Sequence, residues 1–254
     1  LGTWDGLHNG TLVIVDEGHL MGAHDDILAE HQRRGHQLVG LTATPLGISH
    51  RYERLIVAGT KRELRACRAL VPAITYAPWE LRRSHDTYLL REIVARDWRR
   101  LNPAGLPTLG FAGSVAAAKW LADQLDRDGI ASRAISFDTP TGERKEIMAA
   151  WKSGNIKILW NRFVIREGID LPSAYLGILA CKMPSLMGFT QAVGRLLRYS
   201  PQTPDHVVLL DYGGNWRRHP DPNEDVDWPS LWRVEPGEAA ERYRDQLRRG
   251  LRGW

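Results

Sequence analysis

The residues Leu12-Val13-Ile14-Val15-Asp16-Glu17-Gly18-His19 carry a short apolar run directly into two carboxylates. A short, wholly apolar run bounded by polar residues predicts a buried strand of a parallel sheet. In open α/β sheets ligands bind beyond the carboxyl ends of the strands, so Asp16 and Glu17 are directed at a ligand site. Two adjacent carboxylates at such a place suit a magnesium-phosphate ligand. One can hold the metal, directly or through water, while the other orients and deprotonates a water. This stretch alone leaves an alternative open, in which Asp16 caps the helix that follows.

Apolar strands alternate with amphipathic helices along most of the chain, which predicts an α/β fold with a parallel, doubly wound sheet. Further strands are expected at residues 37–41, 71–76, 108–111, 131–137, 156–160, 175–180 and 207–210, and helices at 22–34, 61–70, 86–100, 114–128, 141–154 and 186–197.

A composition shift divides the chain. Residues 102–107 are rich in Pro and Gly, and the preceding segment is rich in Arg and Trp, so we expect a domain boundary between about residues 78 and 106. The predicted segments are 1–80 for the end of a first α/β domain, 81–106 for a linker with a helix, 107–228 for a second α/β domain and 229–254 for a charged terminal helix.

The bulk composition limits the function classes. The 254 residues include two cysteines, Cys67 and Cys181, which give neither a disulfide framework nor a CxxC zinc motif. The sequence contains no apolar run long enough to span a bilayer, and its first residues lack a signal-peptide pattern. We therefore expect an intracellular protein. The net charge of +4 permits binding to a phosphate backbone without requiring it.

Five segments, taken together, resemble a known family. In order they are Asp16–His19, Leu41–Pro45, Phe111–Ser114, Arg166–Pro172 and Gln191–Arg198. Their order and spacing resemble motifs II, III, IV, V and VI of superfamily 2 helicases of the DExH type.

Finer features resemble the phage and prophage helicases that are related to restriction enzymes. These features are the TATP strand end at residues 42–45, the segments 70–72 and 76–78, the helix at 143–154, and a tail with Asp211, Gly214-Asn215, Arg218-His219 and Trp228. The resemblance covers about residues 5–228. It implies two RecA-like parallel-sheet domains, the first incomplete at its N-terminus, and an ATP-dependent helicase or translocase.

The resemblance implies a role for each residue of the first domain's motifs. ATP hydrolysis needs a positioned metal, a positioned water and cations on the departing charge. Asp16 and Glu17 would form the magnesium site, with Asp16 holding the ion through water and Glu17 activating the attacking water. His19 would belong to the nucleotide site and link it to the nucleic acid. Thr42 and Thr44 would carry that coupling through hydroxyl hydrogen bonds.

In the second domain, the resemblance assigns Gln191, Arg195 and Arg198 to the phosphates of ATP, with Arg198 the better arginine-finger candidate. Arg195 and Arg198 are spaced i and i+3, so on a helix they would share a face with Gln191. Gly168 and Asp170 would line the same nucleotide site from a loop. Each segment alone also fits an ordinary turn or a solvated helix.

For nucleic-acid contact, the resemblance points to Ser114, Asn161 and Arg162, with DNA favoured over RNA. The sequence departs from the family here, because Trp160-Asn161-Arg162 stands where small or hydroxyl residues are usual. We expect Trp160 to be a core residue and Arg162 to contact phosphate.

The sequence contains no GxxxxGK[ST] loop to cradle phosphates. We expect a fragment of a larger helicase, which by itself would bind ATP poorly; a degenerate protein is the other explanation. Two different functions also stay open. One is a non-catalytic RecA-like module that binds nucleic acid, and the other is a metal-dependent hydrolase that uses Asp16, Glu17 and His19, with His24 and Asp25 close in sequence.

Overall fold

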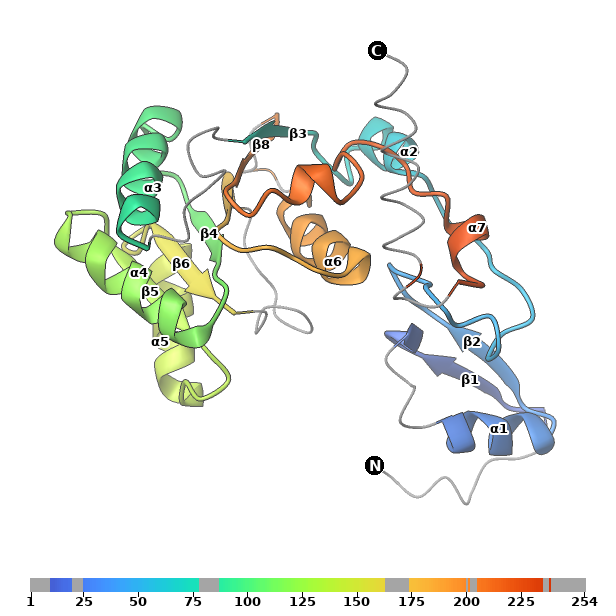
Figure 1. Ribbon diagram of the computed structural model, residues 1–254. Coiled ribbons are helices and arrows are strands. Elements are labelled where there is room, and N and C mark those ends of the chain that lie inside the picture. Colours follow the sequence, from blue (N-terminus) through green and yellow to red (C-terminus); the bar gives the residue numbers. More distant parts are fainter. Residues whose placement is uncertain are drawn as a thin grey trace, which may run out of the picture. The chain divides into compact units, whose positions relative to one another are not determined.

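The computed structural model describes residues 10–19, 25–77, 87–162, 174–199, 201, 205–234 and 238. These residues fall into two compact units, a smaller one within residues 10–58 and 226–238 and a larger one within residues 59–225 (Figure 1). Within the described ranges, no helix is long and apolar enough to cross a membrane.

The smaller unit is built on two parallel strands, β1 (Leu12–Val15) and β2 (Gln37–Gly40), connected through the helix α1 (Asp25–Arg33). The last residues of the two strands, Val15 and Gly40, lie opposite each other. Because the strands are parallel and in this register, the turn after β1 and the segment after β2 leave the sheet at the same end. A short helix, α7 (Trp228–Leu231), also belongs to this unit, and the rest of the predicted terminal helix lies almost wholly outside the described residues.

The prediction that the strand at residues 12–15 is wholly buried is wrong. Leu12 is 53% exposed and Ile14 61% exposed, whereas Val13 between them is 8% exposed. Side chains alternate between the two faces of a strand, and among the described residues only one face of this sheet is covered. An apolar strand is buried on both faces only where a second layer packs against it, and the strand's own sequence does not supply that layer.

The larger unit is a six-stranded parallel sheet in the order β3-β8-β7-β4-β6-β5. Its elements in chain order are α2 (Lys61–Ala66), β3 (Ala73–Tyr76), α3 (Thr87–Leu101), β4 (Thr108–Phe111), α4 (Val115–Arg127), β5 (Ser132–Ile135), α5 (Thr141–Lys152), β6 (Ile158–Asn161), β7 (Leu176–Leu179), α6 (Leu186–Leu196), β8 (Val207–Asp211) and the 3-10 helix η3 (Asn215–Arg217). The predicted doubly wound α/β fold is confirmed here.

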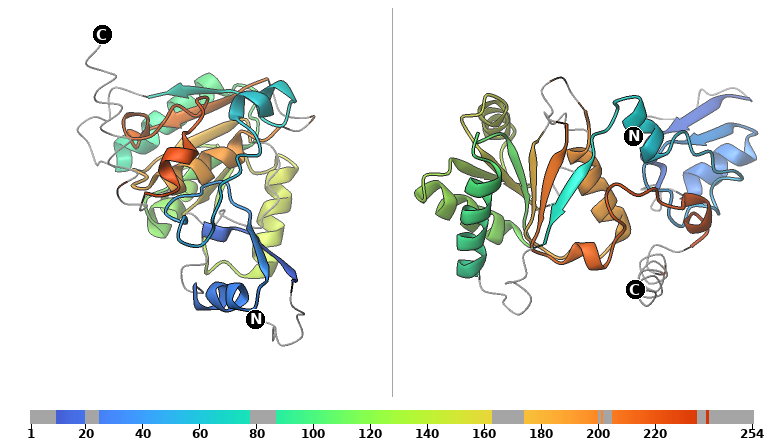
Figure 2. Two further views of the ribbon diagram at one scale, coloured as in Figure 1. Left: turned by 90° about the vertical axis from the view of Figure 1, so that its right-hand side faces the viewer. Right: turned by 90° about the horizontal axis from the view of Figure 1, so that it is seen from above.

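Each face of this sheet carries its own core. Helices α3 and α4 pack over one face, on side chains such as Trp160 and Ile178. Helices α5 and α6 pack over the other face, on side chains such as Leu159 and Phe111 (Figure 2, right). Trp160 is fully buried, which confirms the interpretation of this residue as core. Its ring lies over Gly110, where an added Cβ would come within 2.4 Å of the ring, so the neighbouring strand needs glycine there.

The boundary between the units differs from the sequence prediction. Residues 1–80 were assigned to the first domain, yet β3 pairs with β8 at the edge of the larger sheet, with Ala73 opposite Val207. Asn223 fixes the outer side of β3, because its side chain accepts from the Ala73 N–H and donates to the Ala73 carbonyl. Helix α3, predicted as part of a linker, packs in the core under α4. The sequence of a strand does not show which sheet it joins. The composition shift at Pro78 therefore placed the boundary after β3, whereas β3 belongs to the larger sheet.

Candidate functional site

The turn after β1 carries the two carboxylates that the sequence singled out. Asp16 is exposed, and its Oδ1 accepts a hydrogen bond of 2.9 Å from the Glu17 N–H. Glu17 has a φ of 48°, in the left-handed region that residues other than glycine rarely adopt. Such strain is typical of functional sites, where the surrounding structure holds it. Here the hydrogen bond from the Gly18 N–H to the Leu41 carbonyl, 2.9 Å long, holds the turn against the end of β2.

The side chains after β1 and β2 are joined by hydrogen bonds. The Nδ1 atom of His19 lies 2.8 Å from the hydroxyl of Thr42, which also accepts a bond of 3.0 Å from the Thr44 N–H. The same His19 nitrogen is 3.4 Å from the Glu17 carboxylate. His19 and Thr44 are buried. One polar chain therefore runs from the carboxylate turn to the TAT segment.

Replacing Thr42 with valine tests this chain of contacts. Valine keeps the shape of the side chain but removes the oxygen that meets His19 and the Thr44 N–H. A hydrogen bond of this kind contributes about 0.5–1.5 kcal/mol. If the protein is the ATPase that the family resemblance implies, stimulation of its ATP hydrolysis by nucleic acid should fall about two- to tenfold in the full-length protein. Unstimulated hydrolysis should change less. Thr75→Val in β3 is the matched control, and equal effects of the two substitutions would contradict the role of Thr42.

Sequence reasoning missed Tyr52, which sits beside the carboxylate turn. An added Cβ on Gly40 would lie 2.5 Å from the Tyr52 hydroxyl, and one on Gly18 would lie 3.1 Å from it. Both glycines therefore leave room for the tyrosine. The Tyr52 hydroxyl is buried and makes no hydrogen bond to any described residue, and burial raises its pKa above the ordinary value. The only signal in the sequence was glycine at both positions, Gly18 in a turn and Gly40 at a strand end. This signal is weak, because a turn and a strand end can each accept many other residues.

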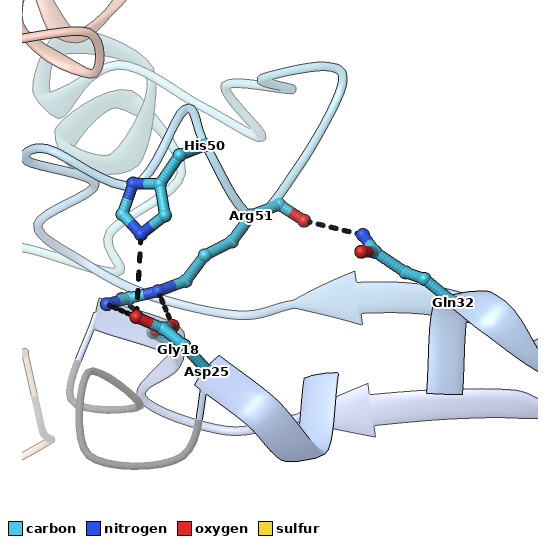
Figure 3. A network of polar contacts seen from close by, with 5 residues as sticks. All are labelled: Gly18, Asp25, Gln32, His50 and Arg51. Carbon is cyan, nitrogen blue, oxygen red and sulfur yellow. Dashed lines mark hydrogen bonds and ion pairs between the residues drawn. The ribbon is translucent and has the colours of Figure 1, made fainter. Parts of the chain in front are cut away.

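The loop that carries Tyr52 is clamped to α1 (Figure 3). Arg51 donates from Nε and Nη2 to the two oxygens of Asp25, and its Nη1 donates to the Gly18 carbonyl at 3.5 Å. The side chain of Gln32 donates to the Arg51 carbonyl at 3.1 Å. His50 approaches Asp25 at 3.8 Å. The Asp25 carboxylate, which the hydrolase alternative would use for a metal, is thus bound to Arg51.

This clamp predicts a pH dependence. The hydrogen bonds from Arg51 hold the pKa of Asp25 below its ordinary value of 3.8. Because the folded-state pKa is the lower one, the stabilisation is present above about pH 4 and is lost as the pH falls through the folded-state pKa. Hydrogen exchange of the backbone amides in residues 46–52 should therefore be faster in Asp25→Asn than in Asp26→Asn at pH 7. The difference should shrink on acidification below pH 4, and a difference that does not depend on pH would contradict the ion pair.

The carboxylate turn fits a magnesium-nucleotide ligand. Magnesium in nucleotide sites is held by one or two carboxylates and by the substrate phosphates. Asp16 is exposed at the end of β1, and the buried Glu17 Oε2 atom makes no hydrogen bond to the residues that the structure describes. Asp16 can hold the ion while Glu17 faces a water. In the described part of the chain, no group of three His, Cys, Asp or Glu side chains is arranged to hold a metal ion by itself.

In the larger unit, α6 positions Gln191 and Arg195, but not Arg198. The helix ends at Leu196, and Arg195 lies in its last turn. Beyond it, Leu197 accepts a hydrogen bond from the Val71 N–H, and Arg198 forms an isolated antiparallel bridge with Leu70. The prediction that Arg195 and Arg198 share a helix face is therefore wrong. The helix ends one residue before its predicted end at residue 197, and the pairing with the segment before β3 leaves Arg198 outside it.

A buried polar network holds the segment that leads into α6. Asn215 is fully buried; its side chain donates to the Cys181 carbonyl at 3.0 Å and to Asp211 at 2.9 Å, and accepts from the Met183 N–H at 2.7 Å. His219 Nε2 lies 2.7 Å from the Met183 carbonyl, and its ring stacks on Phe189 of α6. The tail motif seen in the sequence thus packs against the start of α6.

Two ionisable groups around this network have shifted pKa values. Burial raises the pKa of the Asp211 carboxyl, although hydrogen bonds from Trp216 and Asn215 oppose the shift. Burial also raises the pKa of the Cys181 thiol to about 11. The positive charge of the nearby Arg162 guanidinium favours the thiolate and opposes this rise, but burial has the larger effect. At neutral pH, Cys181 is therefore a thiol and a weak nucleophile.

The nucleic-acid candidates lie at the carboxyl ends of β4 and β6. Ser114 is exposed and caps α4, accepting a hydrogen bond from the Ala117 N–H at 3.0 Å. Asn161 is fully buried, and its side chain donates to the Gly110 carbonyl at 2.9 Å. Arg162 follows it and is partly exposed. Gly168 and Asp170 lie outside the described residues.

Known proteins resemble this chain in sequence. A family described as the helicase conserved C-terminal domain matches residues 90–200. A 51.5 kDa protein of a Lactococcus phage (isolate 7-9) is 28% identical over an alignment of 249 residues, which covers 87% of this chain and 53% of that protein. Putative helicase 22 of Sulfolobus islandicus filamentous virus is 31% identical over 103 residues, 41% of this chain and 18% of that protein. The chain thus spans about half of the first relative and less than a fifth of the second.

Solved structures share its fold. The ATP-dependent Type ISP restriction-modification enzyme LlaBIII, bound to DNA, matches 94% of this chain and 20% of its own, with a TM-score of 0.57 and 15% identity. Mycobacterium smegmatis helicase Lhr, bound to single-stranded DNA and AMP-PNP, matches 80% of this chain and 29% of its own, with a TM-score of 0.53 and 19% identity. At these identities the likeness establishes the fold.

Proposed function

Because this chain is related to the superfamily 2 helicases and carries their conserved C-terminal domain at residues 90–200, we propose that the protein is an ATP-dependent helicase or translocase. It couples hydrolysis of magnesium-ATP to movement along nucleic acid. ATP and Mg²⁺ are its cofactors, and the compartment is the interior of a bacterial cell, where phage proteins act.

The observation that carries this proposal is the chain of polar contacts from the Glu17 carboxylate through His19 to Thr42 and Thr44, in which the last two links are hydrogen bonds. Phosphoryl transfer to water depends on positioning and charge rather than on covalent steps by the protein. Asp16 would hold magnesium, which when bound would supply positive charge against the phosphates, and Glu17 would take the proton of the attacking water. His19 and Thr42 connect this turn to the end of β2, so a shift of the turn on hydrolysis is passed to the second strand.

The larger unit supplies positive charge. Arg195 and Arg198 stabilise the charge that develops on the γ-phosphate, and Gln191 binds the nucleotide from the preceding turn of α6. The two arginines are held in place in different ways. Arg195 is fixed by a packed helix, whereas Arg198 lies in a short bridged segment and is exposed. Gly168 and Asp170 complete the proposed nucleotide contacts.

A single strand of nucleic acid is the proposed track, with DNA favoured over RNA. The exposed N-terminus of α4 at Ser114 presents backbone N–H groups and the positive end of the helix dipole to a phosphate. Arg162 contributes charge, and Asn161 ties the end of β6 to β4 through its hydrogen bond to the Gly110 carbonyl. Contacts of this kind are made to the backbone and carry no sequence information.

The test is steady-state ATP hydrolysis by the full-length protein with magnesium, combined with calorimetry of magnesium binding. We expect hydrolysis, and we expect tight magnesium binding only with nucleotide present. A non-catalytic nucleic-acid-binding module would bind a single strand without hydrolysing ATP. A metal-dependent hydrolase would bind the metal without nucleotide. Either of these two results would overturn the proposal.

A further inference from the structure

The turn after β5 presents an aromatic side chain to solvent. Phe137 is 78% exposed, although phenylalanine is among the residues most often buried. Two residues earlier, Ile135 at the end of β5 is 1% exposed and packs in the core. The chain therefore changes from core to a projecting ring within two residues.

The turn that carries Phe137 is held in place by polar contacts. The Ser136 N–H donates to the Thr139 hydroxyl at 2.8 Å, and the Thr139 N–H donates to the Ser136 carbonyl at 3.2 Å. Arg144 of α5 reaches back and directs Nη2 at three carbonyls of the turn, those of Ser136 at 2.9 Å, Phe137 at 3.4 Å and Thr139 at 3.4 Å. A ring on a rigid turn loses little conformational entropy when it binds a ligand.

The sheet register brings this turn to the edge where the nucleic-acid candidates lie. Ile135, the last residue of β5, is opposite Asn161, and Asn161 is opposite Phe111 at the end of β4. Phe137, Arg162 and Ser114 therefore follow three adjacent strands that end in line. Ligands of open α/β sheets bind at this carboxyl edge. The Asn161 Oδ1 atom at the same edge is buried, and no described residue forms a hydrogen bond with it.

We propose that Phe137 is a stacking platform for a base of the bound single strand. The inference rests on the proposed function, because it assumes that a strand crosses this edge. Every base has an aromatic face, so a phenylalanine ring accepts any of them, while phosphates meet Ser114 and Arg162. Bases in a duplex are already stacked on one another, so the platform selects unpaired nucleic acid.

The experiment measures binding of two fluorescein-labelled single strands to the full-length protein by fluorescence anisotropy. The DNA strand is oligothymidylate and the RNA strand is oligouridylate. Stacking of one base contributes enough that Phe137→Ala should weaken binding about five- to a hundredfold, and Phe137→Tyr should restore it. The salt dependence of binding should keep its slope in Phe137→Ala, because no phosphate contact is lost. Arg162→Ala should reduce that slope by about 0.7.

Two controls separate stacking from a general loss of binding. Trp216→Ala removes another partly exposed aromatic side chain of the same unit, 46% exposed, and should leave affinity unchanged. An oligonucleotide with abasic sites keeps the phosphates but lacks bases, so wild type and Phe137→Ala should bind it equally. Thermal unfolding should be the same for both proteins, because the ring is exposed.

Three results would overturn the proposal, and they are distinguishable. If the wild type binds no single strand, the proposed function fails as well. If the wild type binds and Phe137→Ala binds equally well, the function stands and the platform is disproved. If Phe137→Ala weakens binding to the abasic strand as much as to the intact strand, Phe137 supports the loop and does not stack on a base.

Discussion

Glu17→Gln is expected to reduce ATP hydrolysis by the full-length protein about a hundredfold or more, with nucleotide binding retained. General-base catalysis contributes about 10²–10⁴-fold, and glutamine cannot take the proton. Glutamine keeps the size and hydrogen-bonding reach of glutamate, so the turn at Glu17 with its φ of 48° should keep its shape. The measurement is kcat under saturating ATP and magnesium, with nucleotide affinity followed in parallel.

Glu30→Gln provides the matched control for this substitution. Glu30 lies on α1 in the same unit and forms ion pairs with Arg33 and Arg34 near the surface. Such exposed pairs contribute little, so hydrolysis should stay at the wild-type rate. If Glu17→Gln hydrolyses ATP as fast as Glu30→Gln does, Glu17 is not the base.

Asn215→Ala is expected to destabilise the larger unit by about 3 kcal/mol or more. The substitution leaves the Met183 N–H and the Cys181 carbonyl without this partner inside the protein, and each buried group left unsatisfied costs about 1–3 kcal/mol. The Asp211 carboxylate, whose pKa burial already raises, also loses a donor that stabilises its charged form. Urea unfolding followed by tryptophan fluorescence measures the loss.

The exposed Asn155 of the same unit supplies the control, because Asn155→Ala should be close to neutral. A further expectation separates support of α6 from stability alone. At a temperature where Asn215→Ala is still folded, KM for ATP should rise, because the start of α6 is no longer fixed and Gln191 and Arg195 lose their position. An unchanged unfolding free energy would contradict the role of the network.

Sequence patterns predicted the larger sheet well. Each of β4, β6, β7 and β8 is a short run of mostly apolar residues, and every residue in them is buried. Runs of this kind occur where helices cover both faces of a parallel sheet, and alternating helices such as α4 and α6 supply that cover. Local pattern and global fold agree here, so the element order could be read directly.

Three errors have a common cause, which is that long-range partners are not encoded locally. Leu12 and Ile14 have the sequence of a buried strand, and their exposure depends on what else packs there. Arg198 does not share a helix face with Arg195, because residues 197–199 pair with the segment before β3. β3 joins the larger sheet through β8, which lies far from it in sequence.

The candidate site was predictable where a motif names the residue, and not where packing decides. Asp16, Glu17, His19 and Thr42 were found from their order in the chain. Neither Tyr52 nor the Arg51–Asp25 clamp belongs to such a motif. Tyr52 is identified by its close approach to Gly40, and the clamp by the hydrogen bond from Arg51 to Asp25. Phe137 was read as the end of an apolar strand, because a sequence does not show that Arg144 holds its turn away from the core.

The most direct test of the central claim is the ratio of ATP hydrolysis rates of the full-length protein with and without saturating single-stranded DNA. A protein that couples hydrolysis to movement along a strand must hydrolyse faster when the strand is bound. We predict that the rate rises severalfold on addition of the strand, and that Glu17→Gln removes both the basal and the stimulated rate. A hydrolysis rate that is the same with and without the strand would contradict the account.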